Sequence, residues 1–445
     1  MAEAAPTLSG WQIATYVLPA IPIAALGLPL TVHIPPLYAE STVLTLGLVG
    51  TLFSISKLVD VFTDPLFGWI SDRFSPRWGR RRTWMIASAP VLMVSTYFLF
   101  HPPETAGRLY LVGWLSLVYL GYTMAFLSHL SWAAELARSY DERSRLMGWR
   151  QVGATAGMLL VLVLPSIGEV TGLIAGAAAR AALMSDFILL MVPITFAIIC
   201  FGVPDPVPKR DPAKLSLKDL QTIIGNHHLR RVLSADFLLS AALGITGSLY
   251  VWFTVYVLEM PSLTSVILVA YFGAATFCVP IWMRLARKYE KHTVFAGAMA
   301  YGMVTLGLFS LTPGAPLGIV ILVNCLYGCA YGAGVFLARA MVADTADYDE
   351  AKTGVSRMGT FYSGLTLTAK TGFAFGPMVA YNLLEWVGFD PKGTVDAAAS
   401  NWLLFTFTVP SIALLGCAGL IIRGHRLTRA EHARIRQQLD HGISR

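Results

Sequence analysis

The stretch SKLVDVFTDPLFGWISDRF, residues 56–74, begins like an apolar membrane segment but contains Lys57, Asp60 and Asp64, followed by a proline. In soluble globular proteins about a quarter of the residues are charged. In this chain of 445 residues only 13% are charged and 55% are hydrophobic. Such a composition is typical of an integral membrane protein, where charges inside an apolar segment need a partner or a wet cavity.

Apolar runs of about 20 residues, each long enough to cross roughly 30 Å of hydrocarbon, recur along the whole chain. They lack the alternation of a membrane barrel, so the spans must be helices. We predict an all-α polytopic membrane protein with twelve transmembrane helices. The predicted spans are 11–34, 42–71, 83–101, 108–137, 147–167, 181–203, 231–259, 263–285, 293–312, 316–341, 357–388 and 400–423.

The basic residues fix a predicted orientation in the membrane. Most of the 33 Lys and Arg lie in every second connection and in the tail, whereas the opposite connections hold Arg108, Arg180 and Lys392. By the positive-inside rule, both termini are predicted to be cytoplasmic. The net charge of +7 is therefore explained by topology and does not indicate a nucleic-acid partner. The basic tail is predicted to rest on anionic membrane lipids.

An internal repeat divides the chain into two halves. GWISDRFSPRWGRRRTW (68–84) is answered by PIWMRLARKYEKHTV (280–294), and SYDERSRLMGWR (139–150) by DYDEAKTGVSRMG (347–359). Nearly equal offsets indicate duplication, and paired six-helix halves around a central cavity are the architecture of the major facilitator fold. The predicted parts are a cation-binding half 1–203, a cytoplasmic linker 204–230, a second half 231–423 and a tail 424–445.

The carboxylates of the opening stretch are candidates for cation binding. Lys57, Asp60 and Asp64 lie on one helix face, because they are three and four residues apart. Two carboxylates one turn apart can bind a small cation or share a proton, and the Thr123 hydroxyl could complete the shell. Alternatively, Asp64 caps a helix restart at Pro65, and Lys57–Asp60 is a structural ion pair.

Other ionisable groups inside the predicted spans are few. Lys370 lies mid-span among small residues and could balance the helix-two carboxylates, so Lys57 and Lys370 are predicted to couple charge. Arg150 lies in the first turn of the fifth span and either faces a cavity or extends to the interface. Asp186 and Asp236 are interpreted as interfacial or capping groups, and His129 as a core residue.

A conformational gate is predicted at the helix ends, in addition to the cation site. An Asp-Arg pair, Asp72 and Arg73, faces basic residues on the next helix and could form a charge latch that stabilises one conformation. The alternative is that the basic residues are only topology anchors. The full predicted gating set is Asp72, Arg73, Arg80, Arg81, Arg82, Glu135, Asp344 and Asp347.

The five cysteines, Cys200, Cys278, Cys325, Cys329 and Cys417, all lie in apolar spans. Their placement suggests neither disulfides nor metal ligation, so we interpret them as small core residues. No metal site is predicted beyond Na⁺ at Asp60 and Asp64, and no cofactor.

Over its whole length the chain resembles the glycoside–pentoside–hexuronide:cation symporters, the melibiose-permease branch of the major facilitator superfamily. The resemblance is carried by DVFTDPLFGWISDRFSPRWGRRRTW (60–84), YTMAFLSHLSWAAELARSYDERSRLMGWR (122–150), ADTADYDEAKTGVSRMG (343–359) and Lys370. It implies the major facilitator fold and cation-coupled transport. The implied cation-binding residues are Asp60, Asp64 and Thr123; the predicted substrate-binding residues are Tyr122, Phe126, Trp132, Arg150, Thr366 and Lys370.

The chain departs from the melibiose-permease pattern where that pattern holds sugar hydroxyls. Phe126 stands where such a permease carries an acid, and the first helix, LPAIPIAALGLPL (18–30), contains no acid. Leu130 replaces an expected tryptophan, with Trp132 nearby. Galactoside specificity is therefore not expected, and the similarity extends to sucrose/proton and sodium-dependent lysophospholipid symporters.

The sequence thus predicts a Na⁺- or H⁺-coupled symporter of a sugar-like small molecule that works by alternating access. A transporter of lysophospholipid or another amphiphile is the alternative. A membrane-embedded enzyme is disfavoured, because no nucleophile–base pair, Cys/His metal spacing or phosphate-binding glycine loop is present; a transport-dead sensor is also disfavoured. The expected location is the bacterial inner membrane, as a monomer whose partners are its substrate and membrane lipids.

Overall fold

The computed structural model describes residues 8–73, 78–136, 140–205, 225–354, 358–393, 395–425 and 427–442, and these residues contain helices and no strand. The chain forms two compact units. The first comprises Met1–Pro212 with the short segments Pro261–Val266 and Pro391–Gly393, and the second comprises the remainder. The middle of the predicted linker, 206–224, lies outside the described residues.

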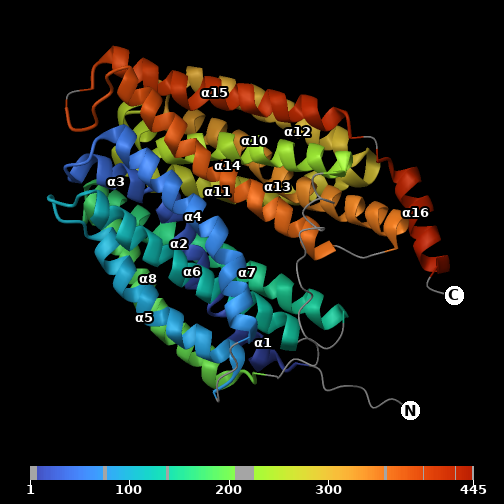
Figure 1. The fold of residues 1–445 in the computed structure, drawn as a ribbon. Coiled ribbons are helices and arrows are strands. Elements are labelled where there is room, and N and C mark those ends of the chain that lie inside the picture. Colours follow the sequence, from blue (N-terminus) through green and yellow to red (C-terminus); the bar gives the residue numbers. More distant parts are fainter. Residues whose placement is uncertain are drawn as a thin grey trace. The chain divides into compact units, whose positions relative to one another are not determined.

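The first unit is a bundle of long helices (Figure 1). Helix α6 packs on α4 and α5, α7 packs on α2, and α8 packs on α5. The predicted first span is divided between two helices, with Pro19 at the start of the second. The helices are α1 Gly10–Val17, α2 Ala20–Val32, α3 Ile34–Ser41, α4 Leu46–Arg73, α5 Arg80–Phe100, α6 Arg108–Leu136, α7 Tyr140–Val170 and α8 Gly176–Gly202.

A glycine allows α7 to approach α2 closely. A Cβ atom at Gly157 would overlap the carbonyl group of Ile21, so no larger residue fits at this position. Membrane helices associate without a hydrophobic driving force, because lipid tails are as apolar as their side chains. Small residues at the contacts let the backbones approach closely enough for van der Waals packing. This contact fixes the position of α7, the helix that carries Arg150.

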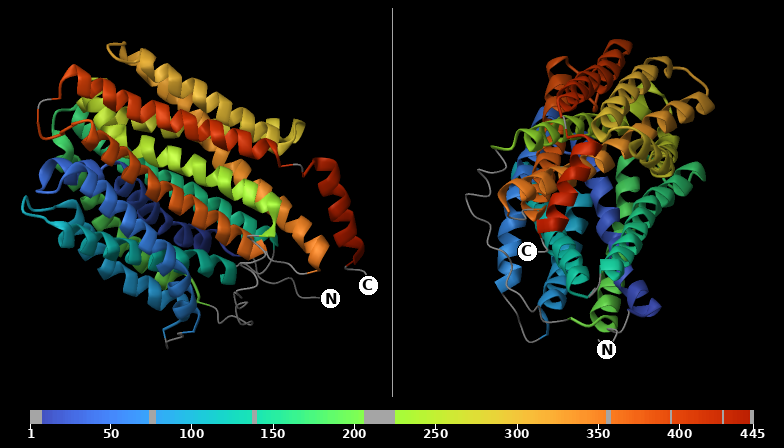
Figure 2. Two further views of the ribbon diagram at one scale, coloured as in Figure 1. Left: turned by 45° about the horizontal axis from the view of Figure 1, so that its top comes forward. Right: turned by 90° about the vertical axis from the view of Figure 1, so that its right-hand side faces the viewer.

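The second unit is also a helix bundle, in which α10 packs on α14 and α15, and α12 packs on α13 and α15. The short helix α16 follows α15 and runs at a steep angle to it (Figure 2). The helices are α10 His227–Trp252, α11 Thr264–Lys288, α12 Lys291–Gly307, α13 Leu317–Thr353, α14 Met358–Trp386, α15 Ala397–Arg423 and α16 Arg429–Gly442.

Close packing of α10 on α14 again depends on glycine. A Cβ atom at Gly376 would overlap the backbone of Gly244, and one at Gly372 would lie 2.5 Å from the carbonyl oxygen of Phe237. Phe237 follows Asp236 directly. Asp236 therefore lies beside a helix contact in which the two backbones nearly touch.

The described helices confirm the predicted fold class. Eleven stretches among the described residues, from Gly10–Val32 to Ala397–Arg423, are long and apolar enough to cross a membrane. Helix α14, of 29 residues, coincides with the remaining predicted span, 357–388. The set agrees with twelve transmembrane helices.

The interpretation of the cysteines as unpaired core residues is wrong for two of them. Cys278 on α11 and Cys329 on α13 form a disulfide, with their Cα atoms 5.3 Å apart. Their positions in apolar spans gave no sign of this pairing, because the contact depends on how α11 packs on α13. Glycine allows that approach, since a Cβ atom at Gly328 would overlap the carbonyl oxygen of Tyr271.

Candidate cation and substrate sites

The two helix-two aspartates converge on one hydroxyl group in the first unit. Thr123 on α6 places its Oγ1 atom 2.9 Å from Oδ1 of Asp60 and 2.6 Å from Oδ1 of Asp64, both on α4. Asp60 and Thr123 are buried, with exposed fractions of 4% and 2%. Packing of α6 against α4 creates this cluster, which we call the oxygen triad.

The oxygen triad is an electronegative cluster of hard ligands. A threonine hydroxyl carries a single hydrogen, so at any moment it donates to only one of the two carboxylates. Two like charges so close also repel each other. The geometry is therefore suited to positive charge: a proton, a small hard cation, or an ammonium group such as that of Lys57 on the same helix.

Three of the predicted substrate-binding residues lie together in the first unit. The rings of Tyr122 and Phe126, one turn apart on α6, are stacked with centroids 5.7 Å apart and planes 9° apart. The Cζ atom of Arg150 on α7 lies 5.0 Å from the centroid of Phe126. The result is an aromatic wall, formed by Tyr122 and Phe126, with a guanidinium group on it.

The other predicted substrate-binding residues lie elsewhere. Trp132 is fully buried, and its indole N–H donates to the carbonyl oxygen of Pro204 at 2.9 Å, so it is not part of the aromatic wall. Thr366 and Lys370 belong to α14 in the second unit. Thr366 is exposed and donates to the carbonyl oxygen of Tyr362 on its own helix at 3.0 Å. Roles for these residues in substrate binding stay predictions.

The core interpretation of His129 agrees with its surroundings in the first unit. The side chain has no exposed surface. Its Nε2 atom lies 2.7 Å from the carbonyl oxygen of Tyr16, whose hydroxyl donates to the carbonyl oxygen of His129 at 2.8 Å. These reciprocal bonds join α1 to α6 next to the aromatic wall.

Three of the six predicted gating residues of the first unit, Arg80, Arg81 and Glu135, form an ion-pair cluster. An Nη atom of Arg80 lies 2.5 Å from Oε1 of Glu135, and an Nη atom of Arg81 lies 2.7 Å from the same oxygen. Asp205 accepts hydrogen bonds from the backbone N–H groups of Arg81 and Arg82 at 2.9 and 3.0 Å. Burial raises the pKa of Asp205, and these N–H donors partly oppose the effect. The side chains of Asp72 and Arg73 lie outside the described part of the chain.

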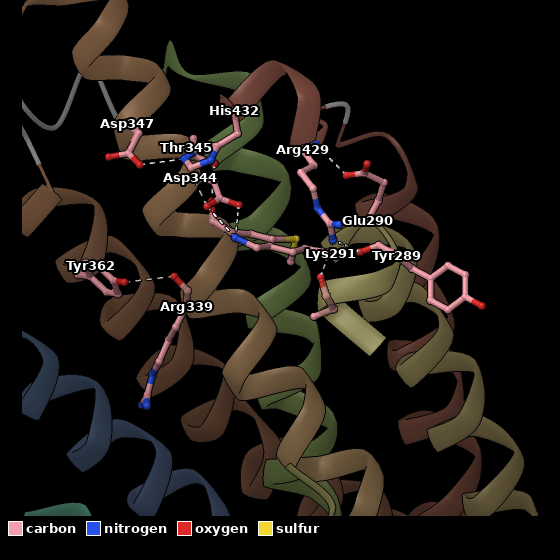
Figure 3. Close-up of polar contacts among 12 residues, drawn as sticks. Tyr289, Glu290, Lys291, Arg339, Asp344, Thr345, Asp347, Tyr362, Arg429 and His432 are labelled. Atoms are coloured by element: carbon pink, nitrogen blue, oxygen red, sulfur yellow. Dashed lines mark hydrogen bonds and ion pairs between the residues drawn. The ribbon is translucent and has the colours of Figure 1, made fainter. Parts of the chain in front are cut away.

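The second unit has its own ion-pair cluster, around the other two predicted gating residues (Figure 3). Lys291 donates to both carboxylate oxygens of Asp344 at 2.7 and 2.6 Å. Nε2 of His432, on α16, lies 2.9 Å from Oδ2 of Asp347. Sequence reasoning missed Lys291 and His432. The basic tail helix therefore contacts α13 through a histidine, and its predicted contact with lipid stays a prediction.

The environment of Asp236 also differs from the one predicted from the sequence. The position near a span end indicates an interfacial or capping group, but the side chain is buried, with 5% exposed. It accepts a hydrogen bond from Thr368 Oγ1 at 2.9 Å. The acid is on α10 and the hydroxyl on α14, so only the packing of these helices brings them together. An aspartate inside an apolar run was the available signal.

Membrane-length helices that enclose buried ionisable clusters are typical of a membrane transporter. The pattern of the MFS/sugar transport protein family matches residues 15–429, and the chain belongs to this family. The resemblance identified from sequence is thereby confirmed. The family indicates a transporter, as predicted, rather than an enzyme.

Individual relatives are similar over most of their length. The inner membrane symporter YicJ of Escherichia coli is 25% identical over 414 residues, covering 90% of this chain and 88% of that protein. The isoprimeverose transporter of Lactiplantibacillus pentosus is 23% identical over 414 residues, covering 88% and 84%. The crystal structure of the nucleoside transporter NupG has a TM-score of 0.68 at 13% identity, covering 94% and 100%, which shows a shared fold.

Proposed function

We propose that this protein is a cation-coupled secondary active symporter of a sugar-like small molecule. The coupling ion, Na⁺ or H⁺, binds at Asp60, Asp64 and Thr123. The observation that carries the proposal is the oxygen triad, in which two carboxylates from one helix meet a hydroxyl from another at 2.9 and 2.6 Å. Such a cluster of oxygen ligands suits a hard cation, and two adjacent carboxylates equally suit a shared proton.

Coupling follows from the charge that the ion brings. An ion bound at the oxygen triad changes the net charge next to Lys57 and, in our proposal, the electrostatic force on Lys370. The electrostatic potential at the substrate site therefore differs between the ion-bound and the ion-free protein. Linkage then requires that the ion tighten substrate binding by the same factor by which substrate tightens ion binding. The ion-pair clusters at Glu135 and at Asp344 serve as gates that close and open in turn during alternating access.

The substrate class is supported by the family and by its members. The names of relatives include an isoprimeverose transporter and a raffinose carrier protein. An aromatic wall such as Tyr122–Phe126 suits the apolar face of a sugar ring. Nothing in these comparisons favours a lysophospholipid, so that alternative is dropped. We further propose a bacterial inner-membrane location with both termini in the cytoplasm, as the basic connections predict.

The test is uptake by purified protein in proteoliposomes. A panel of neutral and acidic monosaccharides and glycosides is offered with an inward Na⁺ gradient, with an inward proton gradient, or with neither. We expect accumulation above the external concentration under one of the two gradients. Uptake that only equilibrates under every gradient would show a facilitator and overturn the coupling. Failure to take up any sugar would overturn the substrate class.

A further inference from the structure

Helix α11 is the least enclosed of the membrane spans. In its most apolar stretch 22% of the residues are buried, the smallest share among the eleven spans found in the described part of the chain. Phe277 and Ile281 expose 82% and 53% of their surface. The position of such a helix depends on a small number of contacts, because few neighbours surround it.

The noncovalent contacts of α11 with α13 are close but individually weak. A Cβ atom at Gly332 would lie 2.5 Å from the carbonyl oxygen of Ala275, so the two backbones pack directly on each other. The Sγ atom of Cys325 lies 3.6 Å from the carbonyl oxygen of Ala270, and a thiol is a weak donor. Such contacts bring two helices together but resist their separation only modestly.

The disulfide adds a covalent contact at the same interface. Cys278 and Cys329 are 51 residues apart in the sequence, with their Cα atoms 5.3 Å apart. The indole N–H of Trp282, one turn after Cys278, donates to the carbonyl oxygen of Cys329 at 2.8 Å. The segment between the two cysteines contains the whole of α12, so the bond ties three consecutive helices into one loop.

A proline lies next to the disulfide. Pro280 is inside α11, shortly after Cys278. Proline has no backbone N–H, so the helix loses one internal hydrogen bond at this point and can bend there. The disulfide therefore holds α11 against α13 at the place where α11 could otherwise hinge.

Beyond Pro280, α11 leads into the ion-pair cluster of the second unit (Figure 3). Lys291, at the start of α12, donates to both carboxylate oxygens of Asp344 at 2.7 and 2.6 Å. Asp344 is on α13, the helix that also carries Cys329. A bend of α11 at the proline that moved its end away from α13 would separate Lys291 from Asp344.

We propose that the disulfide Cys278–Cys329 is a redox-controlled lock on the gate at Asp344. While the bond is formed, α11 cannot swing away from α13 and the gate opens slowly; reduction frees the hinge. The inference rests on the gating role proposed for Asp344 and adds its regulation.

The reductant of this lock is a small dithiol. One of its thiolates attacks a sulfur of the disulfide, and its second thiol completes the exchange. The protein S–S bond breaks, the two cysteines become thiols, and the dithiol is oxidised to its own disulfide. Cys278 and Cys329 are both partly exposed, so a reductant that enters the membrane can reach them.

The first measurement is the state of the cysteines. Protein purified without reductant is denatured, labelled with N-ethylmaleimide and weighed by mass spectrometry. We expect labels on three of the five cysteines, namely Cys200, Cys325 and Cys417, and on all five after treatment with dithiothreitol. Five labels without reductant would overturn the lock.

The second measurement is hydrogen exchange of the intact protein over residues 281–291. We expect dithiothreitol to speed exchange of this segment about tenfold, because it opens locally once the bond is broken. Cys278→Ser shows the fast exchange without reductant and no longer responds to it. Cys325→Ser is the matched control, since this thiol is on α13 one turn from Cys329 and outside the bond, and it keeps the wild-type response.

The third measurement is uptake of the sugar panel in proteoliposomes. We expect the initial rate to rise about threefold on reduction and in Cys278→Ser, because gate opening limits turnover. Unchanged exchange on reduction, or faster exchange at an unchanged uptake rate, means that the disulfide is only a structural link and overturns the lock. Absence of uptake in both redox states overturns the proposed transport instead, and hydrogen exchange around Lys291 alone then decides the lock.

Discussion

Each unit contains a buried carboxylate bonded to a threonine hydroxyl, and the two sites differ in stoichiometry. In the second unit one acid, Asp236, meets one donor, Thr368, at 2.9 Å. In the first unit two acids, Asp60 and Asp64, meet one donor, Thr123. A hydroxyl hydrogen satisfies one carboxylate oxygen at a time. The comparison suggests that the Asp236 site serves packing, whereas the oxygen triad is the one suited to an ion.

The largest expected effect is the loss of either aspartate of the triad. Asp60→Asn and Asp64→Asn each remove one of the charges that hold the ion. We expect the affinity for the coupling ion to fall about 100-fold or more, equivalent to about 2.7 kcal/mol of lost ion binding. Gradient-driven accumulation is then lost, while part of substrate binding remains. Uptake in proteoliposomes measures this, with Asp186→Asn, an exposed acid on α8, as the control. Undiminished accumulation in both variants would contradict the cation site.

A large effect on stability is expected from Glu135→Gln. This change takes the carboxylate from the buried guanidinium groups of Arg80 and Arg81, and breaking a buried ion pair costs about 3–5 kcal/mol. Asp344→Asn removes the carboxylate from Lys291, which is 37% exposed, so the loss there is expected to be smaller. Thermal unfolding in detergent compares the two. An equal or larger loss for Asp344→Asn would mean that burial does not set the strength of these clusters.

A smaller effect on ion coupling is expected when the hydroxyl group of Thr123 is removed. Thr123→Ala removes the oxygen shared by both acids, and we expect the apparent affinity for the coupling ion to fall about tenfold. Thr195→Ala is the matched control, because its hydroxyl is buried and bonds to the carbonyl oxygen of Met191 on its own helix. Ion-dependent substrate binding is the measurement, and equal effects of the two changes would contradict a special role for Thr123.

The counterpart site of the second unit provides the sharpest contrast. Asp236→Asn keeps an acceptor for Thr368, so we expect the affinity for the coupling ion to change by less than about twofold. The same titration that detects the Thr123→Ala effect measures it. A loss of ion dependence comparable to that of Asp64→Asn would show that the second unit also takes part in ion binding, and the comparison would break down.

The smallest effect concerns pH and lies outside the spans. Burial lowers the pKa of His425 to about 4, and the neighbouring charges of His228 and His292 act in the same direction. The unfolded chain, with a histidine pKa near about 6.5, takes up the proton first as pH falls. His425 therefore contributes stability at neutral pH that is lost between about pH 6.5 and 4. His425→Gln should flatten the decline in melting temperature across this window; an unchanged slope would exclude the contribution.

Local periodicity is the part of this protein that can be predicted from its residues. Apolar run lengths predict the helices, and spacings of three and four residues place Lys57, Asp60 and Asp64 on one face of α4. Such relations depend only on the geometry of a single helix. The candidate cation-binding residues and the charged residues at the helix ends can therefore be predicted from the sequence. Membership of the family can also be predicted, because it depends on sequence motifs.

Distances between helices could not be predicted, because they depend on where backbones approach one another. Glycine contacts such as Gly157 with Ile21 and Gly376 with Gly244 set the relative positions of helices that are far apart in sequence. Packing of α6 on α4 brings Thr123 to Asp60 and Asp64. The approach of α13 to α11, with Gly328 against Tyr271, brings Cys278 to Cys329.

The sequence by itself determined which charges enter the membrane. Tertiary packing decided which of them the fold pairs with an opposite charge, because such pairing needs atoms from a second helix within about 3 Å. Arg80 and Arg81 receive the carboxylate of Glu135 in this way, whereas Arg150 receives the ring of Phe126.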